Sequence, residues 1–274
     1  MNPPDSTFFT DLHSHLVPGV DDGARTLEET LEGIQRLRDE GIRSVATTPH
    51  LDGSLTRRPD ALEARLREVH LAWSPVLEEA SITFPDMVFI QAFEVMLDVP
   101  DADFSDPRTR LGDTSFVLVE WPRLKVPPAA GPALARIRDA GYQVILAHPE
   151  RYHGLDTGLN LPGEWREMGA RLQVNYGSLV GRYGDEPRRR ALTLLERGWV
   201  DLFATDYHGR PHLPVYLGRA REVMDLLEGA AQFDLLSRTN PARILRGEDP
   251  LPAPPLPHKK GVWEKVRDLF SSKE

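Results

Sequence analysis

Short apolar stretches alternate along this chain with longer segments in which apolar residues recur every three or four positions. The first pattern is typical of buried strands and the second of amphipathic helices. Seven strands are predicted, near residues 8–12, 44–48, 88–93, 116–120, 143–147, 171–175 and 200–205. Because strands that alternate with helices form βα units, the pattern predicts an α/β fold with a mainly parallel sheet.

The first two helices have the clearest signals. Thr26 and Glu29 are spaced as a capping box, and Gly41 suits the left-handed residue that ends a helix. The apolar stripe of this first helix consists of Leu27, Leu31, Ile34 and Leu37. Pro75 is expected to kink the second helix, whose apolar face consists of Leu62, Leu66, Val69, Trp73 and Leu77. The same joint of helix, glycine and strand recurs at Gly141, Gly169 and Gly198.

The chain divides into one predicted α/β domain and a short tail. Residues 1–248 contain the βα units, 249–258 form a proline-rich linker, and 259–274 have apolar residues at helical spacing. The apolar positions of this C-terminal helix are Val262, Trp263, Val266, Leu269 and Phe270. Two roles stay open for it: docking on this protein's own surface or a twin subunit, and contact with another partner or a membrane surface.

Composition argues against several classes of function. The 274 residues contain no cysteine, so neither a disulfide nor a phosphocysteine intermediate is available. The net charge of −9 argues against sequence-independent binding of nucleic acid, which depends on lysine and arginine. No apolar run approaches the roughly 20 residues of a membrane span, and the N-terminus lacks a signal-peptide pattern. We therefore expect a cytoplasmic protein without a transmembrane segment.

Imidazole and carboxylate side chains follow the ends of the predicted strands. The set is His13, His15, Asp22, His50, Glu94, Glu120, His148, Asp206 and His208. His13 and His15 are two residues apart, so both side chains point to the same side of an extended strand. Buried carboxylates that share one barrel mouth need cations, because an unpaired buried charge is costly. Since these side chains are ligands of Zn, Mn and Fe, the pattern predicts a metal-dependent hydrolase.

Six motifs carry a resemblance to a known superfamily. They are Asp11-Leu12-His13-Ser14-His15, Asp21-Asp22-Gly23, Thr48-Pro49-His50, Glu120-Trp121-Pro122, Ala147-His148-Pro149-Glu150-Arg151 and Thr205-Asp206-Tyr207-His208. In this order they resemble the polymerase and histidinol phosphatase (PHP) superfamily. The likeness is to its bacterial manganese-dependent protein tyrosine phosphatases of capsule and exopolysaccharide systems. It runs from Asp11 to about Leu245 and implies a single-domain, distorted (β/α)7 TIM-like barrel.

The resemblance also implies three divalent metal ions, with manganese expected and iron or zinc as alternatives. The implied ligands of the first ion are His13, His15, Glu94 and Asp206. Glu94 bridges to the second ion, whose further ligands are Glu120 and His148. The implied ligands of the third ion are Asp22, His50 and His208. Asp21, beside Asp22, is the alternative carboxylate, with hydrogen bonding in the loop as its structural role.

The implied activity is hydrolysis of phosphotyrosine in a protein, with a bacterial tyrosine kinase or related phosphoprotein as the expected partner. The metals would activate water for direct attack on phosphorus, without a covalent enzyme intermediate. Arg151 matches the family's phosphate-binding arginine, and Arg210 corresponds to a second one. Either Asp206 or His208 would supply a proton to the reaction.

Other functions stay open at this point. One alternative is a phosphatase of histidinol phosphate or another small phosphomonoester. Another is a regulatory or scaffolding module that retains metals only for stability. An exonuclease is disfavoured by the acidic chain, and an amidohydrolase by the lack of a lysine at a strand end.

Some positions depart from the family pattern or lie outside it. The family's glycine two residues before Glu94 is missing, and Phe93 adjoins this glutamate. Tyr207 is an aromatic residue where the family has smaller ones, and it would narrow the mouth of the barrel or stack on a phenyl ring of the substrate. Trp121 and Tyr176 are expected near the rim, where they would shape it or contact substrate. The remaining histidines, which are expected to be structural or exposed, are His70, His153, His212 and His258.

Overall fold

A computed structural model of the protein describes residues 7–155 and 158–257. A strand is present at each of the seven predicted places. These strands are β1 (Phe9–Asp11), β2 (Ile42–Thr47), β4 (Val88–Gln91), β6 (Phe116–Glu120), β7 (Gln143–Ala147), β8 (Arg171–Asn175) and β9 (Leu202–Ala204). All paired strands run parallel, as the alternation of strands and helices predicts.

Two further strands arise because β2 and β4 are interrupted. After Thr48–Pro49 the chain resumes as β3 (His50–Asp52), and after Ala92–Phe93 it resumes as β5 (Glu94–Met96). Pro49 has no N–H to give to a ladder, which explains the first break. The strands therefore form a sheet of order β1-β2-β4 and a sheet of order β3-β5-β6-β7-β8-β9.

Backbone hydrogen bonds connect the two sheets at both ends. Near the breaks, the Glu94 N–H at the start of β5 donates to the Thr48 carbonyl, just after β2, at 3.3 Å. At the other end, Ser14 and Tyr207 form a parallel bridge, and the His15 N–H donates to the Tyr207 carbonyl at 2.8 Å. The first and last strands are thus linked, in agreement with the predicted distorted barrel.

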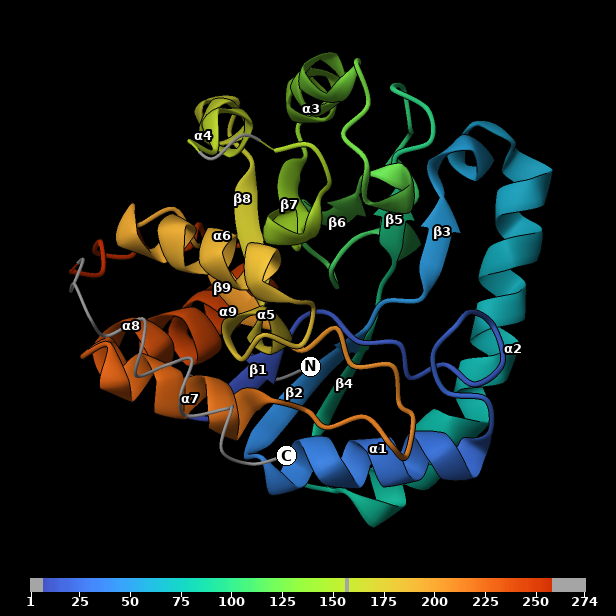
Figure 1. The fold of residues 1–274 in the computed structure, drawn as a ribbon. Helices are drawn as coiled ribbons and strands as arrows, with labels where there is room; N and C mark the ends of the chain where they lie inside the picture. Colours follow the sequence, from blue (N-terminus) through green and yellow to red (C-terminus); the bar gives the residue numbers. More distant parts are fainter. Residues whose placement is uncertain (1–6, 156–157, 258–274) are drawn as a thin grey trace.

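Helices surround the strands (Figure 1). The α-helices are α1 (Leu27–Asp39), α2 (Pro59–Thr83), α3 (Ala130–Asp139), α4 (Asn160–Glu167), α5 (Tyr176–Leu179), α6 (Asp185–Glu196), α7 (Leu217–Leu226), α8 (Ala230–Asp234) and α9 (Asn240–Leu245). Short 3-10 turns are η1 (Gly53–Arg57), η2 (Pro107–Thr109), η3 (Pro122–Leu124) and η4 (Pro149–Arg151), and η5 (Leu235–Thr239) is a π-helical turn.

The ends of the helices largely follow the sequence signals. The Thr26 hydroxyl accepts from the Glu29 N–H at 3.2 Å, but the Glu29 carboxylate accepts from the Arg25 N–H instead of completing the capping box on Thr26. Left-handed backbone is confirmed at the four joint glycines, Gly41, Gly141, Gly169 and Gly198. Along α2, Leu77 is 38% exposed, so its predicted burial is wrong. Beyond Pro75 the buried positions are Val76 and Ala80, which place a different edge of the helix against the core.

Apolar side chains form two clusters, one on each face of the strands. Along β6, Phe116 and Leu118 belong to the inner cluster, while Val117 and Val119 belong to the outer one beneath the helices. The inner cluster also includes Ile244 of α9. Because side chains alternate along a strand, Glu120 at the end of β6 points to the same side as Leu118. Inward-facing residues at strand ends therefore converge above the inner cluster.

Residues 249–257 of the predicted linker pack against the barrel. Ala253 and Leu256 are buried, and the Leu256 N–H donates to the Leu195 carbonyl at 3.0 Å. The predicted helix 259–274 lies outside the described residues, and the proposed division at residue 248 stays a prediction. Within the described part of the chain, no helix combines the length and hydrophobicity needed to cross a membrane.

Candidate metal centre

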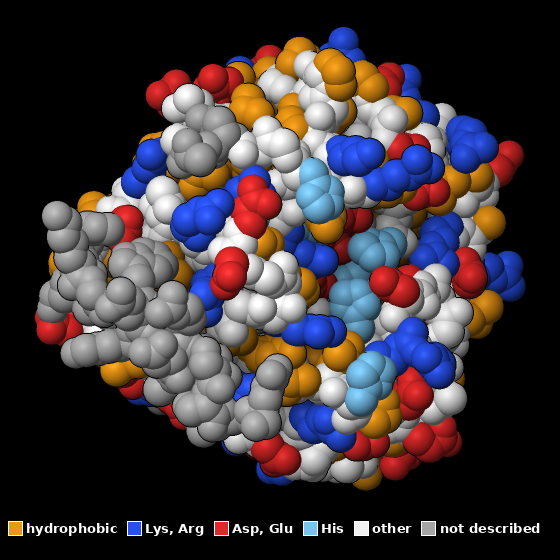
Figure 2. Space-filling model, in the orientation of Figure 1, with side chains coloured by type: hydrophobic (Ala, Val, Ile, Leu, Met, Phe, Trp, Pro, Cys, Tyr) orange, Lys and Arg blue, Asp and Glu red, His pale blue; other side chains and the backbone are white. Residues whose placement is uncertain are grey.

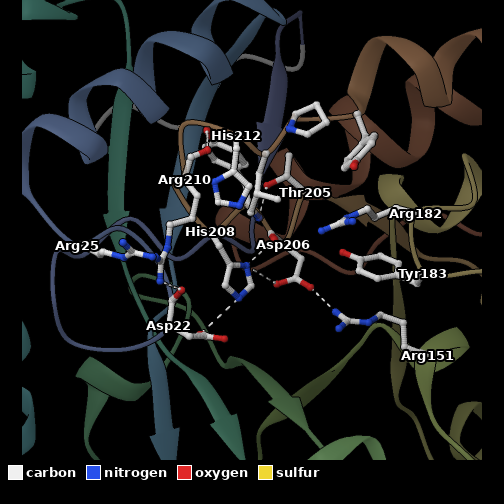
Figure 3. Close-up of a pocket in the computed structure, with 14 residues that line it drawn as sticks. Asp22, Arg25, Arg151, Arg182, Tyr183, Thr205, Asp206, His208, Arg210 and His212 are labelled. Carbon is white, nitrogen blue, oxygen red and sulfur yellow. Dashed lines mark hydrogen bonds and ion pairs between the residues drawn. The ribbon is translucent and has the colours of Figure 1, made fainter. Parts of the chain in front are cut away.

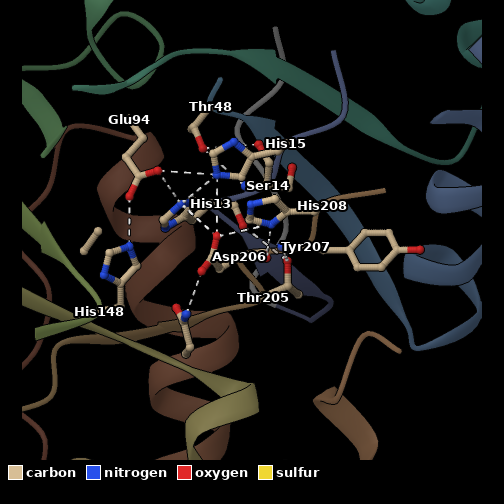
Figure 4. Close-up of polar contacts among 12 residues, drawn as sticks. His13, Ser14, His15, Thr48, Glu94, His148, Thr205, Asp206, Tyr207 and His208 are labelled. Atoms are coloured by element: carbon tan, nitrogen blue, oxygen red, sulfur yellow. Dashed lines mark hydrogen bonds and ion pairs between the residues drawn. The ribbon is translucent and has the colours of Figure 1, made fainter. Parts of the chain in front are cut away.

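All nine predicted ligands come together at the carboxyl ends of the strands and in the loops beside them. Their ligand atoms form four overlapping groups, each with atoms within 4.8 Å of one another. The groups are His13–His15–Glu94, His13–His148–Asp206, His50–Glu94–Glu120 and His15–Asp22–His50–His208. Residues from distant parts of the chain thus form one polar centre (Figure 4).

Glu94 lies in the middle of this centre and is fully buried. Its Oε2 is 3.2 Å from His13 Nε2, 3.4 Å from His15 Nε2 and 3.1 Å from His50 Nδ1. Its Oε1 is 3.0 Å from His148 Nε2. Burial alone would raise the pKa of Glu94, but the surrounding histidines hold it well below its usual value.

Hydrogen bonds outside the centre orient two of the histidines. His13 Nδ1–H donates to Gln173 Oε1 at 2.9 Å, and His15 Nδ1–H donates to Asp21 Oδ2 at 2.8 Å. Both bonds leave Nε2 with a lone pair directed into the centre, where the two Nε2 atoms are 3.2 Å apart. A histidine that donates one ring N–H to an amide or carboxylate while the other nitrogen stays free is the usual arrangement of a metal ligand.

Asp22, His50 and His208 form the more exposed edge of the centre. Asp22 Oδ1 lies 3.4 Å from His208 Nε2 and 3.5 Å from His50 Nε2, and the Asp22 side chain is 67% exposed. His208 Nδ1–H donates to the Asp206 carbonyl at 2.9 Å, so its Nε2 also faces the centre with a lone pair. A metal ion held at this edge would remain accessible from the solvent.

Asp206 connects the centre to the candidate phosphate-binding arginine. Its Oδ1 lies 3.4 Å from His13 Nε2 and 3.5 Å from His15 Nε2. Its Oδ2 accepts from Asn175 Nδ2 at 2.9 Å and from Arg151 Nη1 at 2.5 Å. Burial would raise the pKa of Asp206, but the neighbouring histidines and Arg151 lower it, so this residue is a carboxylate.

The donor set fits divalent metal ions. Glu94 Oε2 and His50 Nδ1 are buried and have no hydrogen-bond partner among the described residues. Burial and the nearby Glu94 raise the pKa of Glu120 to about 8, because two carboxylates share this space. Burial would lower the pKa of His13, but the carboxylates of Glu94 and Asp206 raise it. The negative potential that favours protonated histidine also favours a bound cation, and such a cation would coordinate these oxygen and nitrogen atoms.

Two residues of the centre have a left-handed backbone. The φ angle is 35° at His148, directly after β7, and 50° at Asp206, two residues after the end of β9. Such a conformation costs on the order of 1–2 kcal/mol for a residue with a Cβ atom. It turns the chain sharply at the strand end, so that the side chain enters the centre. Strain of this kind is typical of functional sites.

Buried polar side chains hold the strand ends in place. The Tyr152 hydroxyl donates to the Ala147 carbonyl at 2.9 Å and accepts from the Trp121 N–H at 3.1 Å, next to His148 and Glu120. On the other side, Asp11 accepts from the Thr205 N–H at 2.8 Å and from the Thr205 hydroxyl. These bonds fix the spacing between strands that carry the candidate ligands.

A cavity of about 380 Å³ opens beside Asp206 and His208. The histidines of this region gather in a hollow that has basic side chains around it (Figure 2). Arg151 and Arg210 line the cavity (Figure 3), and Arg210 Nη2 donates to the Asp22 carbonyl at 2.7 Å. Tyr183 also lines it, with its ring centroid 4.2 Å from Cζ of Arg151. The cavity thus combines guanidinium groups with an aromatic wall.

Comparison with known proteins identifies the family. The family described as capsular polysaccharide synthesis, CpsB/CapC, matches residues 9–246. The chain belongs to this family. The tyrosine-protein phosphatase YwqE of Bacillus subtilis (strain 168) is 26% identical over 91% of this chain and 96% of its own length. The tyrosine-protein phosphatase CpsB of Streptococcus pneumoniae is 26% identical over 86% of this chain and 97% of its own length.

A solved structure confirms the fold of this CpsB/CapC family member. It comes from work on YwqE and CpsB, described as unique metal-dependent tyrosine phosphatases, and superposes with a TM-score of 0.71. The sequence identity is 24%, and the match covers 92% of this chain and 100% of that chain. The resemblance to the bacterial tyrosine phosphatases of capsule systems, which the motifs predict, is confirmed by the family match and the curated relatives.

Several aromatic residues lie differently from expectation. Trp121 and Tyr176 are fully buried, so neither can contact substrate. The ring of Tyr207 is directed away from the histidine cluster (Figure 4), because Gly33 of α1 leaves room for it. A Cβ atom at Gly33 would lie 3.1 Å from Tyr207 Cε1. His212 is exposed, as expected, and it also lines the cavity.

Sequence reasoning missed two amide side chains of β8. Leu172 and Val174 belong to the outer cluster, so Gln173 and Asn175 point inward, where they bond His13 and Asp206. The signal was present in the sequence, since two amides alternate with apolar residues in a strand that reads as buried.

Replacement of Gln173 with Leu is expected to lower metal affinity about 10–100-fold, as is usual when a bond that orients a ligand is lost. The measurement is a titration of metal-free protein with Mn²⁺, followed by activity and by elemental analysis. Gln143→Leu is the matched control. Gln143 lies at the start of β7, and its side-chain amide donates to the Ser115 hydroxyl and to no other group in the described part of the chain. Equal affinities for the two variants would contradict the role given to Gln173.

Proposed function

We propose that this CpsB/CapC family member is a metal-dependent protein-tyrosine phosphatase of capsule or exopolysaccharide synthesis. The observation that carries this function is a cluster of histidines and carboxylates that opens into a cavity lined by arginine and tyrosine. Metals suit hydrolysis, guanidinium groups suit a phosphate, and aromatic rings suit a phenyl group. YwqE and CpsB, which match nearly the whole chain, are named tyrosine phosphatases and support the same activity.

The proposed cofactors are three divalent ions, with manganese preferred and iron or zinc as alternatives. The first ion would be held by His13, His15, Glu94 and Asp206. The second would be held by Glu94, Glu120 and His148, although His148 Nε2 and Glu120 Oε2 are 4.0 Å apart. The third would be held by Asp22, His50 and His208. Bound ions supply Lewis acidity toward the phosphoryl oxygens and activation of the attacking water.

The chain's own side chains bind and orient the substrate. Arg151 would exchange its bond with Asp206 for two bonds with the phosphate, since a planar guanidinium matches phosphate oxygens bidentately. Asp206 Oδ2 accepts from Arg151 and Asn175, as a carboxylate does, so Asp206 has no proton to donate to the leaving group. Phenol has a pKa near 10 and leaves with little help, which fits a tyrosine phosphate better than an alkyl phosphate.

The partner follows from the proposed activity. A phosphotyrosine protein, with a bacterial tyrosine kinase or related phosphoprotein as the first candidate, would be the substrate. The net charge of −9 gives no support for nucleic-acid binding. The cytoplasmic location and the role of residues 259–274 stay predictions.

Chelation provides the decisive test of this function. Protein purified without chelator is expected to release phosphate from a phosphotyrosine peptide faster than from histidinol phosphate when Mn²⁺ is present. EDTA should abolish this activity, and added Mn²⁺ should restore it, whereas thiol reagents should have no effect because the chain contains no cysteine. Phosphate release and bound metal are measured on the same samples.

Two other results would favour the alternatives. Hydrolysis of histidinol phosphate alone would indicate a phosphatase of small phosphomonoesters. Bound metal without hydrolysis of either substrate would indicate a regulatory module with a structural metal site. The cavity disfavours the first alternative, because Tyr183 and Tyr216 line it and provide aromatic surface beside Arg151.

A further inference from the structure

The cavity beside the metal centre contains more positive charge than one phosphate requires. Its arginines are Arg25, Arg151, Arg182 and Arg210. Arg151 bonds Asp206, and Arg210 bonds the Asp22 carbonyl. The guanidinium groups of Arg25 and Arg182 are exposed, and neither forms a hydrogen bond or ion pair with residues 7–155 and 158–257. Two arginines of this cavity are therefore free to meet a ligand.

Nearby arginines show that acidic partners are within reach along the same segments. In α6, Arg188 pairs with Asp185 and Arg190 pairs with Glu186. Arg25 precedes Glu28 and Glu29, yet only its backbone N–H bonds the Glu29 carboxylate. The side chains of Arg25 and Arg182 are directed to the cavity instead. Arg25 and Arg182 thus line the cavity although carboxylates are close to them along the chain.

The two free arginines lie on opposite sides of the centre (Figure 3). Arg25 is on the side of Asp22, in the loop before α1, while Arg182 is on the side of Tyr183 and Arg151, between α5 and α6. His208 and Asp206 lie between them. A phosphotyrosine that enters at the centre would place the residues before and after it near these two guanidinium groups.

We propose that Arg25 and Arg182 select phosphotyrosine sites that have anionic side chains on both sides of the phosphorylated tyrosine. This inference rests on the proposed phosphatase function and specifies its substrate class. The anionic group is a carboxylate of Asp or Glu or a second phosphate, since a guanidinium binds both. Exposed pairs of this kind strengthen binding modestly, so they tune substrate choice and leave the chemical step to the metal centre.

Peptide kinetics with manganese-loaded protein test this selectivity. Two phosphotyrosine peptides are compared, with either glutamate or alanine at the positions flanking the tyrosine. The wild type is expected to prefer the glutamate peptide in kcat/KM by about five- to twentyfold. Arg25→Gln and Arg182→Gln should each lower this ratio about two- to fivefold through KM. High salt should reduce it further, because the pairs are exposed.

Arg189→Gln is the matched control, because Arg189 is an exposed arginine of α6 outside the cavity. It removes the same charge and is expected to keep the wild-type ratio. A ratio near one in the wild type, or an equal fall in all three variants, would overturn the proposal. A doubly phosphorylated peptide shows which anion is preferred. Free phosphotyrosine separates the hypotheses: if neither it nor either peptide is hydrolysed, the proposed function fails, whereas equal hydrolysis of both peptides overturns only the selectivity.

Discussion

Glu94→Gln is expected to abolish phosphate release, with a loss in kcat/KM of at least about a thousandfold, or about 4 kcal/mol. The physical reason is that Glu94 is the carboxylate shared by the histidines of the centre. Its two oxygens lie within 3.4 Å of nitrogen atoms of His13, His15, His50 and His148. A neutral amide keeps the volume but removes the negative charge and one oxygen ligand, so the bound metal is also expected to fall.

Elemental analysis and phosphate release on the same protein samples distinguish this effect from unfolding. Glu150→Gln is a suitable control, because Glu150 is also fully buried and bonds the Asn175 N–H and the Ser178 hydroxyl. That variant should retain its metal, and circular dichroism should show both variants folded. Full metal content and wild-type turnover in Glu94→Gln would remove Glu94 from the centre and with it the proposed bridging role.

The strands could be predicted because each buried strand is a short run of apolar residues in the sequence. Runs such as Phe116–Val119 are apolar on both faces, since a parallel strand between inner and outer clusters is covered on both sides. The ligands could be predicted because each follows such a run. The strands β3 and β5 were missed, because a residue such as Pro49 marks the end of one strand but does not show that another follows at once.

Side-chain direction was the part that sequence could not supply. Tyr207 stands between two candidate ligands in sequence, yet its ring points to Gly33 of α1, far away along the chain. Arg182 and Tyr183 carry no motif, and they reach the cavity only because α5 follows β8 closely and turns back beside Arg151. Such placements depend on tertiary packing rather than on the residue types nearby.

Replacement of Arg151 gives the second large expected effect on activity. Arg151→Lys should lower kcat/KM for a phosphotyrosine peptide by about a hundredfold, a value typical of the loss of one group that stabilises charge in the transition state. Lysine keeps the charge but lacks the planar fork, and it cannot stack on Tyr183 as the guanidinium does at 4.2 Å. Bound metal should stay unchanged, which separates this variant from Glu94→Gln.

The division of the Arg151→Lys loss between kcat and KM shows what the arginine does. If Arg151 only captures the phosphate, KM rises and kcat persists; if it also stabilises the charge that develops on the phosphoryl oxygens, kcat falls as well. We expect the second result, because Asp206 holds Arg151 at the edge of the centre at 2.5 Å, beside the position proposed for the phosphate. Arg188→Lys, outside the cavity, should retain wild-type kinetics. Wild-type kinetics in Arg151→Lys as well would show that the metal centre binds the phosphate without this arginine.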